Sequence, residues 1–263
     1  MMKLYERLGF CDGGVITLVG AGGKTSLMFR LARELAEAGE TVLSTTTTKI
    51  GKPETDTSEA VIISSSVQTV LDEARKRLPG HLHLTAAWGC LGDQNKLTGF
   101  SGPEIDQIHK SGLFRWILVE GDGAARRSLK APAPYEPVIP DCTRWLVTLV
   151  GLDAVGKALS DRTVFRSRLY AQITGLSQGD AVTEASIARA IVHDQGLMKG
   201  CPSTAVRYVF FNKAEDAALH QSGQKISDIL LEQGAQKIDA VFIGAVQGDP
   251  HQVECRQICR NCV

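Results

Sequence analysis

The stretch VITLVGAGGKTS, residues 15–26, carries the first chemical signal, because an apolar run leads through glycines to a lysine and two hydroxyls. Glycines between a buried strand and a helix let backbone N–H groups converge on an anion, and the helix N-terminus adds partial positive charge. We expect Lys24 to reach the β- and γ-phosphates of a nucleotide and Thr25 to ligate Mg²⁺. The expected phosphate contacts are Gly20, Ala21, Gly22, Gly23, Lys24, Thr25 and Ser26. The competing interpretation is a tight turn that needs glycine for geometry alone.

The glycine loop is shorter than the G-x-x-x-x-G-K-[ST] pattern, because Leu18 stands where that pattern has its first glycine. The remaining form, Gly20-x-x-Gly23-Lys24-Thr25, resembles the loop of the Mur-ligase and folylpolyglutamate-synthase group. That resemblance implies an alternative function, ATP-dependent ligation through an acyl phosphate. Such ligases carry a further substrate-binding domain, for which 263 residues leave little room.

Two carboxylates follow the apolar run in RWILVEGDGA, residues 115–124. Ligands of open α/β sheets bind at the carboxyl ends of the strands, where Glu120 and Asp122 are expected. We expect Asp122 to bind Mg²⁺ and Glu120 to orient the attacking water, so that both join Lys24 as catalytic candidates. The alternative is an ordinary acidic turn between a strand and the next element.

Polar residues close two other expected strands. Thr46 and Thr47, in STTTTK, are placed to contact Mg²⁺ or the γ-phosphate, or they simply belong to a threonine-rich strand. Asn212 and Lys213 open the sequence NKAE, which resembles the guanine-reading N-K-x-D motif with Glu215 in place of the aspartate. We expect Asn212 and Lys213 at the base, which stays open between ATP and GTP, or a polar turn with capping residues.

Three cysteines crowd the C-terminus as C-x3-C-x2-C, at Cys255, Cys259 and Cys262. With His251 nearby, they could ligate zinc or an iron–sulfur cluster. The alternative is a redox-labile tail without a metal, and the sequence does not decide between the two.

Bulk composition excludes several classes of partner. Lysine plus arginine equals aspartate plus glutamate at 29 each, so no basic excess favours nucleic acid or an anionic membrane. No run approaches 18 apolar residues, and the first residues lack the pattern of a signal peptide. We therefore expect a cytoplasmic protein.

Short apolar runs alternate with segments of helical periodicity. The expected strands are 15–19, 41–44, 60–63, 116–120, 145–150, 208–211 and 240–243. The expected helices are 25–38, 67–78, 184–193 and 223–233. This alternation predicts an α/β fold of the P-loop NTPase type, a mostly parallel sheet with helices on both faces. We expect one domain over residues 1–248, followed by a cysteine-containing tail over 249–263.

Several stretches, in order, resemble the YqeC family: VGAGGKTSL, STTTTKI, LVEGDGAARRSLKAPAPYEPVIP, VGLDAVGKAL and GLMKGCP with FFNKAED. The run from EGDG through KAPAP to EPVIP, residues 120–140, is the most specific part. The resemblance implies an accessory protein that matures a selenium-dependent molybdenum hydroxylase or its cofactor. A hydroxylase or another maturation protein would then be its partner.

Three functions stay open at this point. The first is a Mg²⁺-dependent nucleoside triphosphatase that acts in this maturation. The second is the ATP-dependent ligase, and the third is a nucleotide-gated carrier or chaperone in which turnover is negligible.

Overall fold

The computed structural model describes residues 2–51, 60–92, 96–232 and 238–257. The chain divides into two compact units. The first unit holds Met1–Leu18, Thr25–Gly123 and Val138–Trp145, and the second holds Val19–Lys24, Ala124–Pro137 and Leu146–Val263. The glycine loop belongs to the second unit, and α2, which begins at Lys24, continues in the first.

Nine strands belong to a large, mostly parallel sheet. Five of them follow one another in the first unit, all parallel: β1 (Gly14–Gly20), β8 (Trp116–Glu120), β2 (Val42–Thr46), β5 (His83–Ala87) and β4 (Ala60–Ile63). β1, β8, β2 and β5 are buried along nearly all of their length, as strands inside a parallel sheet should be, whereas β4, the last strand in the order, buries only Ile62. The register pairs Glu120 with both Leu18 and Thr46. β8 and β2 therefore end at the same level, whereas β1 continues for two residues beyond Leu18.

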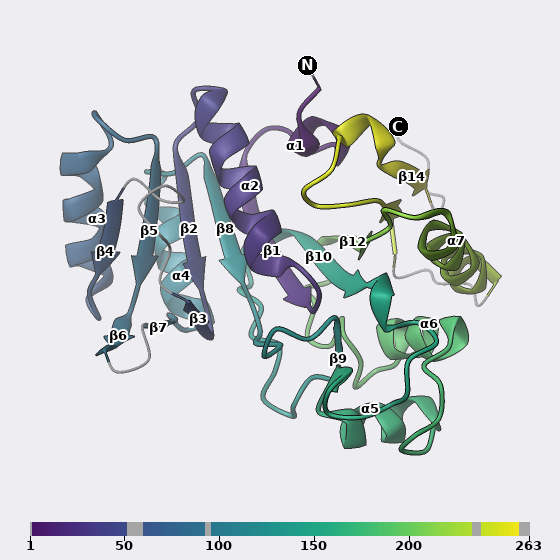
Figure 1. The fold of residues 1–263 in the computed structure, drawn as a ribbon. Helices are drawn as coiled ribbons and strands as arrows, with labels where there is room; N and C mark the ends of the chain where they lie inside the picture. Colours follow the sequence, from purple (N-terminus) through teal and green to yellow (C-terminus); the bar gives the residue numbers. More distant parts are fainter. Residues whose placement is uncertain (1, 52–59, 93–95, 233–237, 258–263) are drawn as a thin grey trace. The chain divides into compact units, whose positions relative to one another are not determined.

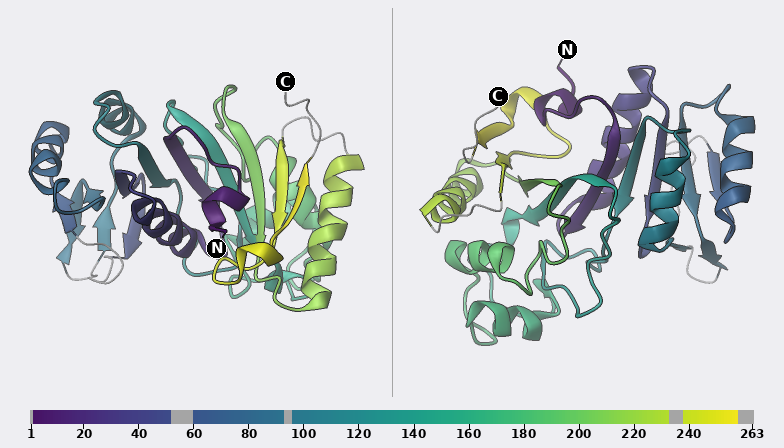
Figure 2. Two further views of the ribbon diagram at one scale, coloured as in Figure 1. Left: turned by 90° about the horizontal axis from the view of Figure 1, so that it is seen from above. Right: turned by 180° about the vertical axis from the view of Figure 1, so that it is seen from behind.

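Helices cover both faces of the sheet in the first unit (Figures 1 and 2). On one face lies α2 (Lys24–Glu37), whose Phe29 ring lies 6.1 Å from the ring of His83 in β5. On the other face, α3 (Val67–Arg77) and α4 (Gly102–Lys110) pack into one apolar cluster with the strands.

Smaller elements complete the first unit. α1 (Leu4–Arg7) is held by the buried Glu34 carboxylate, which accepts the N–H groups of Leu4 and Tyr5. A separate antiparallel sheet contains β3 (Lys49–Gly51), β7 (Lys96–Thr98) and β6 (Gly89–Leu91).

The second unit continues the same type of sheet. Its strands are ordered β14 (Glu254–Gln257), β13 (Ala240–Ile243), β12 (Val206–Asn212) and β10 (Thr143–Gly151). The first three residues of β10 belong to the first unit. β12 and β13 are parallel, and β14 is antiparallel to β13. Its helices are α5 (Ser167–Thr174), α6 (Glu184–Val192) and α7 (Ala217–Glu232). β9 (Leu129–Lys130) pairs with β11 (Val164–Phe165), and the 3-10 turns are η2 (Leu152–Ala154) and η3 (Pro250–Gln252).

The predicted α/β class and the mostly parallel sheet are confirmed. The strands at 60–63, 116–120 and 240–243 have the predicted bounds, whereas α7 begins six residues before the expected start at Gly223. Its N-terminus is fixed by Asp216, whose carboxylate accepts the N–H of Leu219 at 2.8 Å. Within the expected tail, Glu254–Gln257 form an edge strand. The expected end of the last helix at residue 233 lies outside the described residues.

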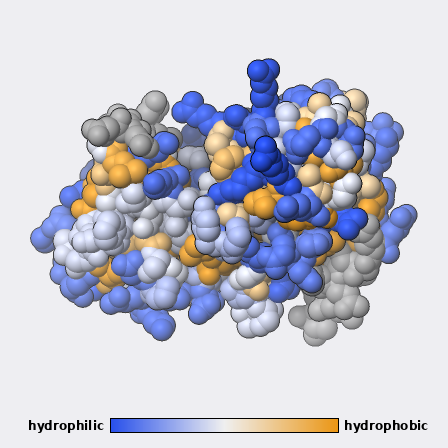
Figure 3. Space-filling model, turned by 90° about the horizontal axis from the view of Figure 1, so that it is seen from below, coloured by the Kyte–Doolittle hydropathy of each residue, from blue (hydrophilic) through white to orange (hydrophobic). Residues whose placement is uncertain are grey.

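In the described residues, no helix combines the length and the apolar character needed to cross a membrane. The face of the molecule in Figure 3 is mostly hydrophilic, and its hydrophobic residues gather in separate areas.

A buried ion cluster anchors the proline-rich segment that follows β9 in the second unit. Lys130 is fully buried and donates to Glu136 at 2.7 Å, and Arg166 donates to both carboxylate oxygens of Glu136, at 2.5 and 3.0 Å. Lys199 donates to the carbonyls of Ala133 and Pro134. Burial opposes the ionisation of Glu136, but the hydrogen bonds from Arg166 and Lys130 outweigh it and hold its pKa at about 2.

Replacing Glu136 with glutamine removes the carboxylate that accepts hydrogen bonds from the buried Lys130 and from Arg166. We expect the free energy of unfolding in urea at pH 7 to fall by roughly 3 kcal/mol. The difference from wild type should narrow as the pH falls from about 4.5 towards 2, because the unfolded wild-type chain binds a proton at Glu136 in this range and the folded protein binds it only near pH 2. Glu73→Gln is the control, since the Glu73 carboxylate pairs with Lys76 and Arg77 at the surface. An equal, small decrease in the free energy of unfolding in both variants would contradict this interpretation.

His83 generates a second prediction. It is buried in β5, its Nε2 lies 2.9 Å from Ser44 Oγ, and burial lowers its pKa from 6.5 to about 4. The unfolded chain therefore binds a proton between these pH values that the folded chain excludes, and stability should be lost as the pH falls through this range. The loss should reach about 2 to 3 kcal/mol by pH 4. In His83→Gln, the midpoint temperature of thermal unfolding should change less with pH over this range than it does in wild type. The same pH dependence in both proteins would rule the prediction out.

Candidate functional site

The glycine loop of the second unit has a backbone that only glycine fits. Gly20, Gly22 and Gly23 have φ angles of +89°, +83° and +132°. A Cβ at Gly20 would overlap the Leu149 carbonyl oxygen, and one at Gly22 would come within 2.5 Å of the Gly151 nitrogen. A Cβ at Gly23 would overlap the Asn212 side-chain amide. The loop is thus pressed against the end of β10 and against Asn212, and a side chain at any of the three glycines would displace it.

Hydrogen bonds to two other segments of the second unit hold the same loop in place. The N–H of Ala21 donates to the Leu149 carbonyl at 2.9 Å, and the N–H of Gly22 donates to the Arg127 carbonyl at 3.1 Å. Lys24 is 4% exposed, and its ammonium turns back over the loop to donate to the Gly20 carbonyl at 2.6 Å. A positive charge is therefore held over the backbone of the loop at the start of α2, where the first N–H groups of a helix have no intrahelical acceptor.

Asn212 ties the glycine loop to the turn that follows β13. Its Nδ2 donates to the Gly22 carbonyl at 2.6 Å, and its Oδ1 accepts the N–H of Val246 at 2.8 Å. The side chain is buried, so both ends of its amide are satisfied by protein groups. The structure thus places Asn212 at the glycine loop, where its side-chain amide holds the loop in position.

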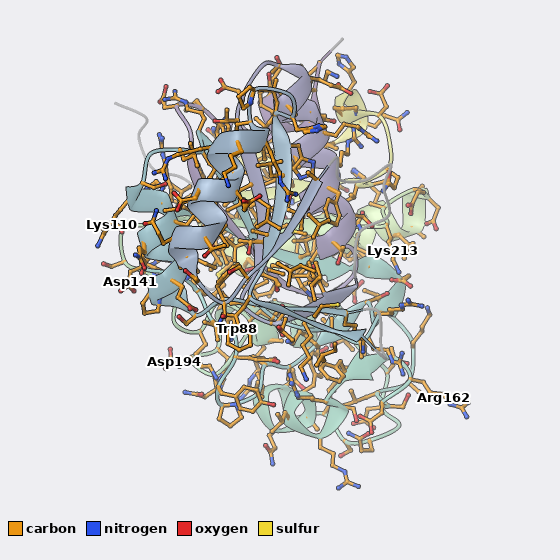
Figure 4. All side chains as sticks on the ribbon, turned by 90° about the vertical axis from the view of Figure 1, so that its left-hand side faces the viewer. Trp88, Lys110, Asp141, Arg162, Asp194 and Lys213 are labelled. Atoms are coloured by element: carbon orange, nitrogen blue, oxygen red, sulfur yellow. The ribbon has the colours of Figure 1, made fainter. Side chains whose placement is uncertain are left out.

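Lys213 follows in the left-handed conformation, with a φ of +66° (labelled in Figure 4). Its ammonium donates to Ser128 Oγ at 2.7 Å and to Asp153 Oδ2 at 3.1 Å. Burial raises the pKa of Asp153, but hydrogen bonds from Ser128 and Lys213 outweigh this effect and lower it. Sequence reasoning missed Ser128 and Asp153, whose only signal was their place in the stretches ARRSLK and GLDA.

The first unit holds the two acidic candidate residues, Glu120 and Asp122. Thr25 Oγ1 donates to Glu120 Oε2 at 2.7 Å, so the hydroxyl next in sequence to Lys24 contacts the carboxylate that ends β8. Glu120 is 6% exposed and Asp122 is 1% exposed. Ser26, also in the first turn of α2, is exposed. The unit therefore brings together a hydroxyl and a carboxylate, which are oxygen ligands of the kind that Mg²⁺ prefers.

The threonines at the end of β2 bond to the backbone. Thr46 Oγ1 donates to the Glu120 carbonyl at 2.8 Å, and Thr47 Oγ1 donates to the carbonyls of Gly121, at 3.3 Å, and Val138, at 2.8 Å. These bonds fasten the ends of β2 and β8 to each other. They hold the segment that carries Glu120 in place, whatever else the hydroxyls contact.

The cysteine cluster lies only partly in the described chain. Cys255 pairs with Phe242 between β14 and β13, whereas Cys259 and Cys262 lie outside the described residues. Among the residues that are described, no three His, Cys, Asp or Glu side chains are grouped as metal ligands.

Comparison with known proteins gives the relationship of this chain. The model of the family described as YqeC protein matches residues 16–168, which include the glycine loop, Glu120, Asp122 and Asp153. The Escherichia coli (strain K12) protein named "Uncharacterized protein YqeC" is 30% identical over 236 residues, covering 90% of this chain and 89% of that one. The expected family is thereby confirmed: the chain belongs to the YqeC family.

Proposed function

We propose that this protein binds a nucleoside triphosphate with Mg²⁺ and hydrolyses it. The observation that carries the proposal is the glycine loop, with three positive φ angles and a buried lysine whose ammonium lies over the loop. The N–H groups of Ala21 and Gly22 already donate to protein carbonyls, contrary to the expectation that they contact phosphate. Such a loop still fixes the lysine and the N–H groups that follow Gly22 in place before any ligand arrives. That is what binding of a polyphosphate requires.

Lys24 and the loop would hold the phosphates. The ammonium now donates to the Gly20 carbonyl, a neutral acceptor, and a β- or γ-phosphate oxygen would be a stronger, charged one. The fit of Gly22 and Gly23 against Gly151 and Asn212 supports the proposal further, because it fixes the backbone of the loop.

Thr25 and Asp122 would hold Mg²⁺, which neutralises charge on the β- and γ-phosphates when it is bound. Glu120 would orient a water for attack on the γ-phosphorus, with cleavage of the bond to the β–γ bridging oxygen. The link between Thr25 Oγ1 and Glu120 Oε2 supports this division of roles, since it connects the metal-binding hydroxyl to the water-orienting carboxylate. Thr46 and Thr47 would fix the position of Glu120 through their backbone bonds.

The process in which this activity would serve is a further part of the proposal, and it rests on the family resemblance alone. We propose maturation of a selenium-dependent molybdenum hydroxylase or its cofactor, with a maturation protein or the hydroxylase as partner. A nucleotide-gated carrier would use the same loop, but it would bind nucleotide without turnover.

Lys24→Ala should weaken binding of fluorescently labelled ATP or GTP in the presence of Mg²⁺ by roughly 10- to 100-fold, because a charge-assisted contact to phosphate is lost. Lys110→Ala is the control, since Lys110 is exposed at the end of α4 (Figure 4). Equal affinity for wild type, Lys24→Ala and Lys110→Ala would refute the phosphate role of the loop.

Glu120→Gln should lower the hydrolysis rate by roughly 10²- to 10⁴-fold while nucleotide affinity changes little, because the amide still accepts a bond from Thr25 but is a weaker base. Asp141→Asn, at an exposed position, is the control. Wild-type binding without measurable phosphate release would favour the carrier, and an unchanged rate in Glu120→Gln would remove Glu120 from the mechanism.

A further inference from the structure

Two turns of the second unit are bound together next to the glycine loop. The first follows β12 and the second follows β13. Gly244 N–H donates to the Phe211 carbonyl at 3.0 Å, and Ala214 N–H donates to the Gly244 carbonyl at 3.2 Å. Asn212 connects both turns to Gly22 through the bonds of its amide. A nucleotide with its phosphates on the loop would therefore place its other end near these turns.

Asn212 cannot itself read a base in this arrangement. Its Nδ2 is bonded to Gly22 and its Oδ1 to Val246, and the side chain is 6% exposed. It is a positioning residue that sets the distance between the phosphate loop and the two turns. The groups that recognise the base must be sought beside it.

Two acids follow Lys213, and the structure separates their roles. Asp216 accepts the N–H of Leu219 and so caps α7. Glu215 is exposed, and within the described part of the chain its carboxylate forms no hydrogen bond or ion pair. In the second turn, Ala245 is half-buried, and its N–H has no acceptor among the described residues. One acceptor group and one donor group are thus available, on turns that are bonded to each other.

We propose that this pair of turns reads a guanine base, with the Ala245 N–H as donor to O6 and the Glu215 carboxylate as acceptor from N1–H and the 2-amino group. The inference rests on the proposed nucleotide binding and adds the identity of the base. The donor and acceptor pattern matches guanine and opposes adenine, which presents an amino donor at position 6 and a lone pair at N1.

Lys213 supports this assignment. Its ammonium is fixed by Asp153 and Ser128, which leaves the methylene stem as the apolar part of the side chain beside the turn. Its left-handed backbone turns the chain two residues before Glu215. Because Glu215 is exposed and Asp216 supplies the cap, a substitution at Glu215 should leave the fold intact.

The test compares GTP, ATP, ITP and XTP by competition against fluorescently labelled GTP with Mg²⁺, on the full chain. Wild type should prefer GTP to ATP by roughly tenfold or more, and ITP, which lacks the 2-amino group, should bind more weakly than GTP. Glu215→Gln should lose affinity for GTP by about tenfold and gain affinity for XTP, because the amide can donate to the carbonyl that xanthine has at position 2. Asp216→Asn is the control, and its affinities for the four nucleotides should follow the same order as those of wild type.

The outcomes separate this inference from the proposed function. Binding of GTP and ATP with equal affinity, lost in Lys24→Ala and unaffected by Glu215→Gln, would overturn the guanine assignment and leave nucleotide binding in place. Absence of binding for all four nucleotides would overturn both. A shift from GTP to XTP in Glu215→Gln, absent from Asp216→Asn, is the result that we expect.

Discussion

The close approach of Gly20, Gly22 and Gly23 to the end of β10 and to Asn212 is the constraint on which the candidate site depends. No side chain fits at these positions without displacing backbone or the Asn212 amide. The loop is therefore held by contacts from the end of β10 and the end of β12. A ligand that binds there meets groups already ordered by the fold, so less conformational entropy is lost on binding.

The parallel sheet explains why the acidic candidates lie where they do. In the first unit, β8 and β2 end in register at Glu120 and Thr46, and Glu120 also pairs with Leu18 of β1. Thr46 and Thr47 then bond to the backbone after β8 and fix its carboxyl end. The polar residues follow the buried strands, so the apolar runs form the sheet and the residues directly after them are available for chemistry.

Local patterns predicted much of this, and long-range pairings accounted for most of what was missed. The strands at 116–120 and 240–243 are continuous apolar runs and were predicted with their observed bounds, whereas β5, with the sequence HLTAA, has too few large apolar residues to stand out. α4 was missed although Ser101 and Glu104 form a capping box at its start, which is a readable signal. The bonds of Lys213 to Ser128 and Asp153 join residues 85 and 60 positions apart, and no local pattern predicts such pairs. β14 is polar and was taken for part of a tail.

We propose that the glycine loop is a phosphate cradle and that the turns beside Asn212 hold the base. A crystal structure with Mg²⁺ and a non-hydrolysable GTP analogue tests it most directly. We predict that the β- and γ-phosphates lie within hydrogen-bond distance of the backbone N–H groups around Gly23 and of the Lys24 ammonium, with guanine O6 at the Ala245 N–H. Phosphates bound away from residues 20–25 would contradict the account.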